Sequence, residues 1–279
     1  SLPAARTLFD RAAGILGYDL LNVCASGPKE RLDSTVVSQP AIYVASLAAL
    51  EKLKQEDPQA SETCVASAGL SLGEYTALTY AGSLSFEEGL ALVKQRGEAM
   101  QAAADARPST MISILLLEVD AVQTLCDEVS AAGLGLVRIA NYLCPGNLVI
   151  SGDTPACEEV ERRAAAAGAK TIRLAVAGAF HTPVMQSAVE KLREALSSVT
   201  LGALRVPVYA NVTATAYSGP QEVQETLARQ VVEPVRWEQS MRAMLEAGVE
   251  RFYEIGPGRV LAGLLKRIQR KTECINITA

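Results

Sequence analysis

A Gly-x-Ser-x-Gly pentapeptide at residues 69–73 constrains the fold more than any other segment of this 279-residue chain. The segment before it, 63–68, is small and partly β-branched, which is typical of a buried strand. The segment after it, 74–81, is long enough for two helical turns and ends at Gly82. A strand, a sharp turn and a helix in this order predict a nucleophile elbow in an α/β fold, with the Ser71 hydroxyl exposed at the turn.

We expect both glycines of the pentapeptide to be required for steric reasons. The tight turn brings the backbone close on either side of Ser71, so a Cβ at Gly69 or Gly73 would clash. The turn also directs the Leu72 N–H towards any oxyanion that forms on a group attached to Ser71. The alternative is a chance match, which the strand and helix on either side disfavour.

His181 is the single histidine, so histidine-rich metal sites are excluded and no other imidazole is available to Ser71. Thr182 suits a helix N-cap and Pro183 suits the first helical position, so His181 precedes a helix. The positive end of that helix disfavours imidazolium, and a neutral ring is what a general base requires. The alternative is a hydrogen-bonded structural histidine.

Arg96 lies in a predicted helix, where Val93, Arg96 and Met100 are spaced three and four residues apart and so share one face. Val93 and Met100 indicate that this face points inward. A buried guanidinium without a partner is costly, so we expect Arg96 to have a carboxylate partner. That carboxylate is either a structural Asp or Glu or part of a substrate.

Further motifs are distributed over nearly the whole chain. They are Leu16–Leu20, Ser38–Ala41, Gly69–Tyr75, Gln95–Gly97, Asn141, Pro145–Asn147, Phe180–His181, Arg229–Gln230, Glu233–Trp237 and Glu254–Gly258. In order and spacing this set resembles the malonyl-CoA:acyl carrier protein transacylase family, whose members load malonyl groups for fatty acid synthesis.

The resemblance implies a role for each matching residue. Ser71 corresponds to the nucleophile that becomes an acyl-serine, and His181 to its base. Arg96 corresponds to the arginine that binds the free carboxylate of the malonyl group. The backbone carbonyl of Gln230 would orient the histidine, and Leu72 would supply an oxyanion N–H.

Two side chains are assigned to the substrate site beside these. Phe180 resembles the residue that favours malonyl over bulkier methylmalonyl units in related domains, and Met100 shares the inward face of Arg96. Leu70 stands where many bacterial members have histidine, and in this the chain resembles the plastid-type enzymes of plants and algae. We therefore predict the chloroplast stroma, with the mitochondrion or the cytoplasm as alternatives.

The opening of the chain departs from the family pattern. Members normally begin with a strand that ends in Phe-Pro-Gly-Gln-Gly, whose glutamine supplies a second oxyanion N–H. This chain starts at Ser1–Ala4, apparently downstream of that motif. We expect the first strand to be lacking, at a cost to the rate of about 10²–10³ for one oxyanion donor.

The net charge of −5 bears on the expected partner, because acyl carrier proteins are acidic and two negative bodies repel. A basic cluster near the C-terminus would offset this repulsion: Arg259, Lys266, Arg267, Arg270 and Lys271. We expect this cluster to help dock the carrier protein. The alternative is an ordinary solvated helix face.

Composition is that of a soluble enzyme, with 49% apolar residues. We expect a monomer. The longest apolar run, Ile112–Leu117, is far too short for a membrane span. The six cysteines form no C-x-x-C pair and read as buried residues in a reducing compartment. We expect no metal and no cofactor, since malonyl-CoA would be a substrate, and nothing indicates nucleic acid or membrane binding.

The pattern predicts an α/β fold with a large hydrolase-like lobe, 1–107 and 177–279, and an inserted ferredoxin-like lobe, 108–176. In the small lobe we expect strands at 110–119, 136–141, 148–151 and 170–176 and helices at 121–132 and 155–168, the β-α-β-β-α-β order of that fold. In the large lobe we expect strands at 206–211 and 251–255 and helices at 183–197, 221–232, 241–247 and 260–271.

Two other functions share parts of this pattern. A serine thioesterase or hydrolase would have the same elbow and histidine, but we would expect an Asp or Glu to orient its base. A non-catalytic module that binds carrier protein is the second alternative, and it is suggested only by the missing opening motif.

Overall fold

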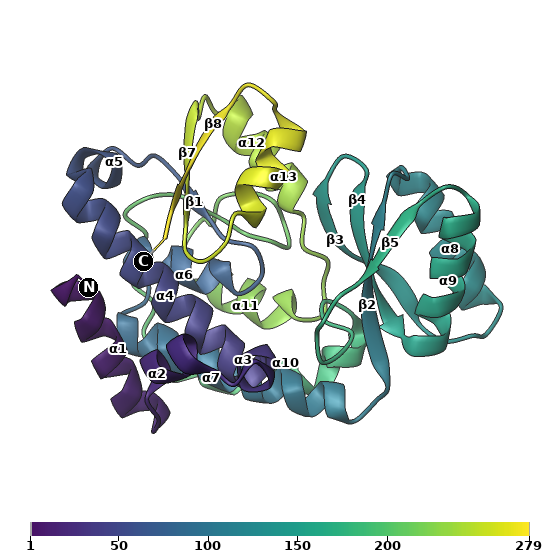
Figure 1. Cartoon of the computed structure of the whole chain (residues 1–279), viewed down its shortest axis with the longest axis horizontal. Coiled ribbons are helices and arrows are strands. Elements are labelled where there is room, and N and C mark those ends of the chain that lie inside the picture. Colours follow the sequence, from purple (N-terminus) through teal and green to yellow (C-terminus); the bar gives the residue numbers. More distant parts are fainter. Residues whose placement is uncertain (1, 279) are drawn as a thin grey trace.

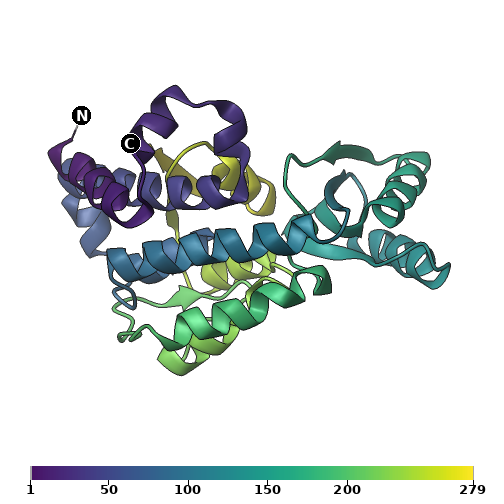
Figure 2. The ribbon, with the colours of Figure 1, turned by 90° about the horizontal axis from the view of Figure 1, so that it is seen from below.

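The N-terminal part of the computed structural model, which describes residues 2–278, is a layer of helices. These helices are α1 (Pro3–Leu16), α2 (Leu20–Ser26), α3 (Lys29–Asp33), α4 (Thr35–Glu56), α5 (Pro58–Glu62), α6 (Gly73–Tyr80) and α7 (Phe86–Asp105). α4 packs closely on α7 because residue 97 is glycine: a Cβ there would lie 2.8 Å from Thr35 O. Figure 2 shows α7 running along the large lobe towards the small one. This packing brings Arg96 next to Gln39.

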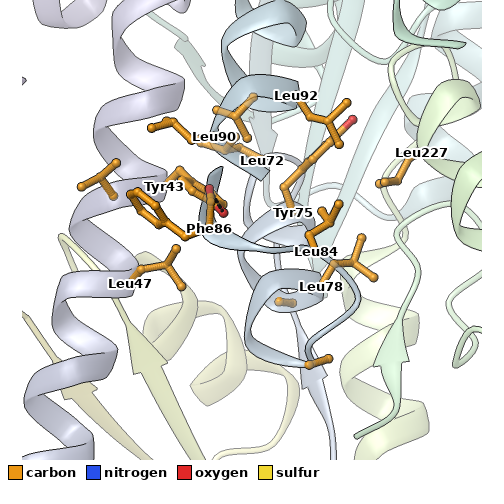
Figure 3. Packing of buried hydrophobic residues seen from close by; sticks show 14 of the residues in the cluster. Tyr43, Leu47, Leu72, Tyr75, Leu78, Leu84, Phe86, Leu90, Leu92 and Leu227 are labelled. Atoms are coloured by element: carbon orange, nitrogen blue, oxygen red, sulfur yellow. Dashed lines mark hydrogen bonds between the residues drawn. The ribbon is translucent and has the colours of Figure 1, made fainter. Parts of the chain in front are cut away.

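The elbow joins a short parallel sheet to α6. Strand β1 (Ser67–Ala68) pairs with β6 (Val208–Tyr209), so each strand is shorter than the sequence predicted. Only two residue pairs share the ladder, and Val65, within the predicted strand, is 65% exposed. After the turn, Leu72 and Tyr75 are buried in the apolar cluster drawn in Figure 3, and their packing holds the elbow in place.

A four-stranded antiparallel sheet forms the other lobe, on the right of Figure 1. Its elements are β2 (Ser109–Leu115), α8 (Val119–Ala131), β3 (Val137–Cys144), β4 (Asn147–Asp153), α9 (Thr154–Ala166) and β5 (Lys170–Arg173). The strand order is β3-β4-β2-β5, and side chains of α8 and α9 share one buried cluster with the sheet. The predicted α/β class with a ferredoxin-like unit is confirmed, while the exact lobe bounds stay a prediction.

Two boundaries in this sheet were predicted too long. β2 ends at Leu115 because Leu116 has a left-handed backbone, with φ of 73°, which an extended strand cannot contain. β5 ends at Arg173, so Ala175 and Val176 belong to the connection that returns to the large lobe.

The chain returns through the elements η1 (Pro183–Met185), α10 (Gln186–Ser197), β6, α11 (Pro220–Gln230), α12 (Trp237–Glu246), β7 (Arg251–Ile255), α13 (Val260–Ile268) and β8 (Glu273–Ile277). The predicted helix 183–197 therefore opens with a 3-10 turn. The predicted helix 260–271 is wrong at its end, because Gln269 is extended and stops α13. Strand β8, which was not predicted, then pairs in parallel with β7. No helix within residues 2–278 has the length and apolarity that crossing a bilayer requires.

Candidate active site

The elbow holds Ser71 in a strained backbone conformation. Its φ is 51°, in the left-handed region that residues with a Cβ rarely adopt. Gly69 is required there, since a Cβ would lie 1.9 Å from Gly73 C. The same expectation for Gly73 is wrong, because a Cβ at that residue meets nothing within 4 Å. The close approach involves the backbone of Gly73 and the Cα of Gly69, so only the first glycine is sterically required.

A chain of hydrogen bonds joins Ser71 to His181 and Gln230. Ser71 Oγ lies 2.9 Å from His181 Nε2, and His181 Nδ1 lies 2.7 Å from Gln230 O. A carbonyl oxygen only accepts, so Nδ1 carries the proton and Nε2 presents its lone pair to the hydroxyl. The imidazole is therefore set up to remove the Ser71 proton, and a backbone carbonyl stands where a hydrolase would have a carboxylate.

The imidazole is held in its neutral form. Burial, and next the positive charge of Arg96, lower the pKa of His181 to about 4. The sequence predicted a neutral ring for a different reason, the dipole of the following helix. That helix begins only as a three-residue 3-10 turn, so desolvation and Arg96 are the physical causes.

Arg96 is 1% exposed and points at the serine. Its Nη2 donates to Ser71 Oγ at 2.9 Å and to Gln230 Oε1 at 2.8 Å, and its Nη1 donates to Gln39 Oε1 at 2.6 Å. Of the two carboxylates that the sequence left open, the structural one is not found: within residues 2–278 Arg96 forms no ion pair, and neutral amide and hydroxyl oxygens accept its protons. A buried cation with neutral partners can still receive an anion.

A cavity of about 490 Å³ opens above these groups, between the large lobe and the segment that follows β5. Its lining contains Ser71, Leu72, Arg96, Met100 and Phe180 among the predicted site residues. The remaining walls are Leu32, Asp33, Thr35, Ser38, Gln39, Ala41, Ile42, Leu70, Ala175 and Val176. A cavity with mostly apolar walls, and with the Arg96 cation next to Ser71 in its lining, suits an acyl group that ends in an acid.

The Leu72 N–H has no acceptor among residues 2–278 in the structure, whereas the Ser71 N–H is taken by Asn211 Oδ1 at 2.6 Å. The first of these groups is therefore available to an oxyanion and the second is not. This matches the arrangement expected of an elbow, in which the residue after the nucleophile donates.

Glu74 is a buried site residue whose part in the site the sequence did not reveal. It is 0% exposed and accepts from Gln230 Nε2, Tyr217 Oη and the Asn211 N–H. Burial raises the pKa of its carboxyl to about 7, although the hydrogen bonds from Tyr217, Gln230 and Asn211 act in the opposite direction. The sequence did contain one signal for this role, because Glu74 is a charged residue three positions after Ser71, on the helix that follows the elbow.

The predicted docking residues do not form one helical cluster. Lys266 and Arg267 are on α13 and Arg259 is its N-cap, but Arg270 and Lys271 lie beyond its end. Arg267 Nη2 donates to Pro145 O at 2.9 Å, which ties α13 to the β3–β4 turn. All five side chains are exposed.

Metal-binding side chains are not gathered anywhere in the part of the chain that the structure describes: no three of His, Cys, Asp and Glu lie together in it. The six cysteines are free.

The elbow serine, the neutral imidazole and the α/β scaffold define an acyltransferase, and the acyl transferase domain model matches residues 4–276. The chain belongs to the family of malonyl-CoA-acyl carrier protein transacylases. It is 42% identical to the mitochondrial transacylase of Mus musculus, covering 97% of this chain and 74% of that protein. It is 39% identical to the Bacillus subtilis transacylase, covering 99% and 86% respectively.

Solved structures agree with the sequence relatives. The malonyl CoA-acyl carrier protein transacylase of Coxiella burnetii superposes with a TM-score of 0.95 at 33% identity, covering 100% of this chain and 87% of that one. The malonyl-transacylase PlMCAT, solved in complex with the type II PKS acyl-carrier protein AntF, superposes with a TM-score of 0.94 at 34% identity, covering 99% and 88%.

Proposed function

We propose that the chain transfers a malonyl group from malonyl-CoA to the phosphopantetheine thiol of acyl carrier protein, through a malonyl-serine on Ser71, in fatty acid biosynthesis. One observation carries the proposal: Ser71 Oγ lies 2.9 Å from both His181 Nε2 and Arg96 Nη2. The imidazole activates the hydroxyl, and the guanidinium supplies a cation where the carboxylate of a malonyl group would lie.

Acylation follows from these positions. His181 Nε2 takes the hydroxyl proton as Ser71 Oγ attacks the thioester carbonyl. The oxyanion of the tetrahedral intermediate then accepts a hydrogen bond from the Leu72 N–H. The intermediate collapses with cleavage of the C–S bond. The imidazolium returns its proton to the departing CoA sulfur, leaving the malonyl ester on Ser71.

Deacylation is the reverse sequence with a second thiol. His181 Nε2 removes the proton from the carrier's phosphopantetheine thiol, which attacks the ester carbonyl. The C–O bond to Ser71 then breaks, and the imidazolium returns its proton to Ser71 Oγ. Arg96 holds the malonyl carboxylate during both halves, while Met100 and Phe180 bound the acyl pocket. A two-step reaction of this kind has ping-pong kinetics.

A hydrolase is the weaker alternative, for two reasons. The base is oriented by the Gln230 carbonyl, and Arg96 occupies the acyl pocket where a thioesterase for neutral acyl chains would present apolar walls. A module that only binds carrier protein would have no use for a neutral imidazole within hydrogen-bonding distance of an elbow serine.

Intact-protein mass spectrometry tests the proposal. After brief incubation with malonyl-CoA, we expect a single malonyl adduct that holo acyl carrier protein discharges and that the Ser71→Ala variant lacks. Release of free malonate without an adduct would identify a hydrolase instead. Carrier binding without any acylation would support the binding module.

The compartment is a separate proposal. Leu70 favours the chloroplast stroma, yet relatives from Mus musculus, Homo sapiens and Drosophila melanogaster, at 42%, 44% and 42% identity, are named mitochondrial. Among the predicted alternatives we therefore favour the mitochondrion. Organelle fractionation of source cells, with an antibody against this chain, distinguishes the two.

A further inference from the structure

One buried amide spans the elbow and takes no part in the chemistry described so far. Asn211 Oδ1 accepts the Ser71 N–H at 2.6 Å, and Asn211 Nδ2 donates to Gly69 O at 2.8 Å. The residue is 1% exposed, so these bonds form away from water. A single side chain thus joins the end of the strand to the apex of the turn.

The elbow requires such a tie because Ser71 has a φ of 51°. Strained backbone persists only where the surrounding structure over-determines it. The Asn211 amide provides two of these constraints from a segment 140 residues further along the chain. Gln230 Nε2 adds a third, since it donates to Ser71 O at 2.9 Å.

Asn211 is itself fixed by its backbone. Its N–H faces both carboxylate oxygens of Glu74 at 3.3 Å, and its carbonyl accepts the Arg236 N–H at 2.8 Å. Glu74 also accepts from the side-chain amide of Gln230, whose backbone carbonyl holds the imidazole. The hydrogen bonds therefore run in a closed circuit from the backbone of the serine to the support of its base.

We propose that Asn211 is a positioning residue for acyl transfer, whose amide keeps the Ser71 hydroxyl in line with the imidazole and with the Leu72 N–H. Asn211 does not line the cavity, so it acts through the elbow and makes no contact with the acyl group. This inference rests on the proposed function of Ser71 as the nucleophile.

Two substitutions at this position test the proposal by rapid-quench measurement of malonyl-serine formation. Asn211→Asp keeps the size and the acceptor for the Ser71 N–H but cannot donate to Gly69 O, while Asn211→Leu removes both bonds. We expect the acylation rate to fall roughly 10- to 100-fold in each, because small misplacements of a nucleophile have large effects on rate. The KM for malonyl-CoA should stay within about 2-fold, because the pocket walls are unchanged.

Asn276 offers a control away from the elbow, since its partly exposed amide also donates to a backbone carbonyl, Gly258 O, at 2.8 Å. Asn276→Leu should lower Tm and leave the acylation rate unchanged. If Asn211→Leu does not fold, the nearly isosteric Asn211→Asp decides the question.

Wild-type acylation in a folded Asn211 variant, or a loss confined to KM, would overturn the positioning role. The Ser71→Ala variant separates this failure from failure of the proposed function. An adduct that survives in Ser71→Ala would reject the nucleophile itself, whereas a Ser71-dependent adduct with unaffected Asn211 variants rejects only the role of Asn211.

Discussion

Arg96 Nη2 donates a hydrogen bond to Ser71 Oγ at 2.9 Å, so the cation of the acyl pocket and the nucleophile are in direct contact. The hydroxyl is thereby bonded on two sides, accepting from the guanidinium and donating to the imidazole. An acyl group on Ser71 would carry its free carboxylate only a few bonds from the ester, within reach of the same guanidinium. We therefore propose that the short distance between these two side chains selects for an acyl group that ends in an acid.

Arg96→Ala should therefore change selectivity more than general reactivity. We expect malonyl transfer to fall by roughly 10²-fold or more, because loss of one partner of a buried charged pair costs ~2–5 kcal/mol. Transfer of uncharged acyl groups should be kept or increased. Steady-state kinetics with malonyl-CoA and acetyl-CoA measure both, and Lys94→Ala, on α7 outside the cavity, is the control. Malonyl transfer at wild-type efficiency would show that Arg96 does not bind the substrate acid.

The pH dependence of acylation should reflect the buried imidazole. With a pKa of about 4 for His181, kcat/KM should stay level on acidification and decline only near that pH, well below the ordinary histidine value of 6.5. The unfolded chain takes up a proton below 6.5 and the native state only near 4, so stability is lost as the pH falls through this window. Denaturant unfolding at each pH separates this loss from the kinetic effect. An acid limb centred near 6.5 would contradict the shielding of the ring.

The two elbow glycines give a matched pair of substitutions. Gly69→Ala should destabilise the protein by about 3 kcal/mol, the upper end of overpacking, and abolish acylation, since its Cβ would overlap the Gly73 backbone. Gly73→Ala should be neutral or stabilising by up to ~1 kcal/mol, because its Cβ meets open space at the start of a helix. Urea unfolding measures both. Equal losses in the two variants would mean that the elbow geometry is wrong.

Glu74 should make stability depend on pH in the opposite sense to His181. Its pKa is raised from 4.5 to about 7, so the native state retains a proton that the unfolded chain releases above 4.5. Its contribution is full below 4.5 and is lost as the pH rises through about 7. Glu74→Gln should remove this downward slope and leave the rise with pH that His181 causes, although its hydrogen-bond losses lower stability at every pH. The wild-type profile also contains the opposite slope from His181, so the readout is the difference in unfolding free energy between wild type and Glu74→Gln. A difference that stays constant from pH 4.5 to beyond 7 would show that the carboxyl titrates as an exposed one.

Local sequence signals predicted part of this site, and tertiary contacts supplied the rest. The elbow follows from residues 69–73 because turn, strand and helix are all local, and the inward face of Arg96 follows from helical spacing. The hydrogen-bond partners of these residues cannot be predicted from local sequence, because Gln39 is 57 positions from Arg96 and Asn211 is 140 positions from Ser71. Such pairs depend on how α4, α7 and the β6 segment pack. Asn211 is a polar residue after a short strand, and nothing in the neighbouring sequence indicates which group it binds.

The carrier-docking hypothesis can now be tested with better chosen residues. Arg267 is unsuitable because it donates to Pro145 O, so its reversal would also disturb the contact of α13 with the β3–β4 turn. Arg270 and Lys271 are exposed beyond the helix end, and the double substitution to Glu should raise the KM for acyl carrier protein roughly 10-fold at low salt. Malonyl-CoA loading should be unaffected, and the difference should shrink as salt screens the charges.

A control with the same change in net charge completes this experiment. Lys191 and Arg193 are exposed on α10, on the opposite side of the large lobe in Figure 1, and their substitution by Glu lowers the net charge by the same four units. If the two double variants raise the carrier KM equally, the effect comes from net charge and the basic cluster is only a solvated surface. A rise confined to Arg270 and Lys271 identifies a local docking surface, because long-range repulsion alone depends little on which surface charges are reversed.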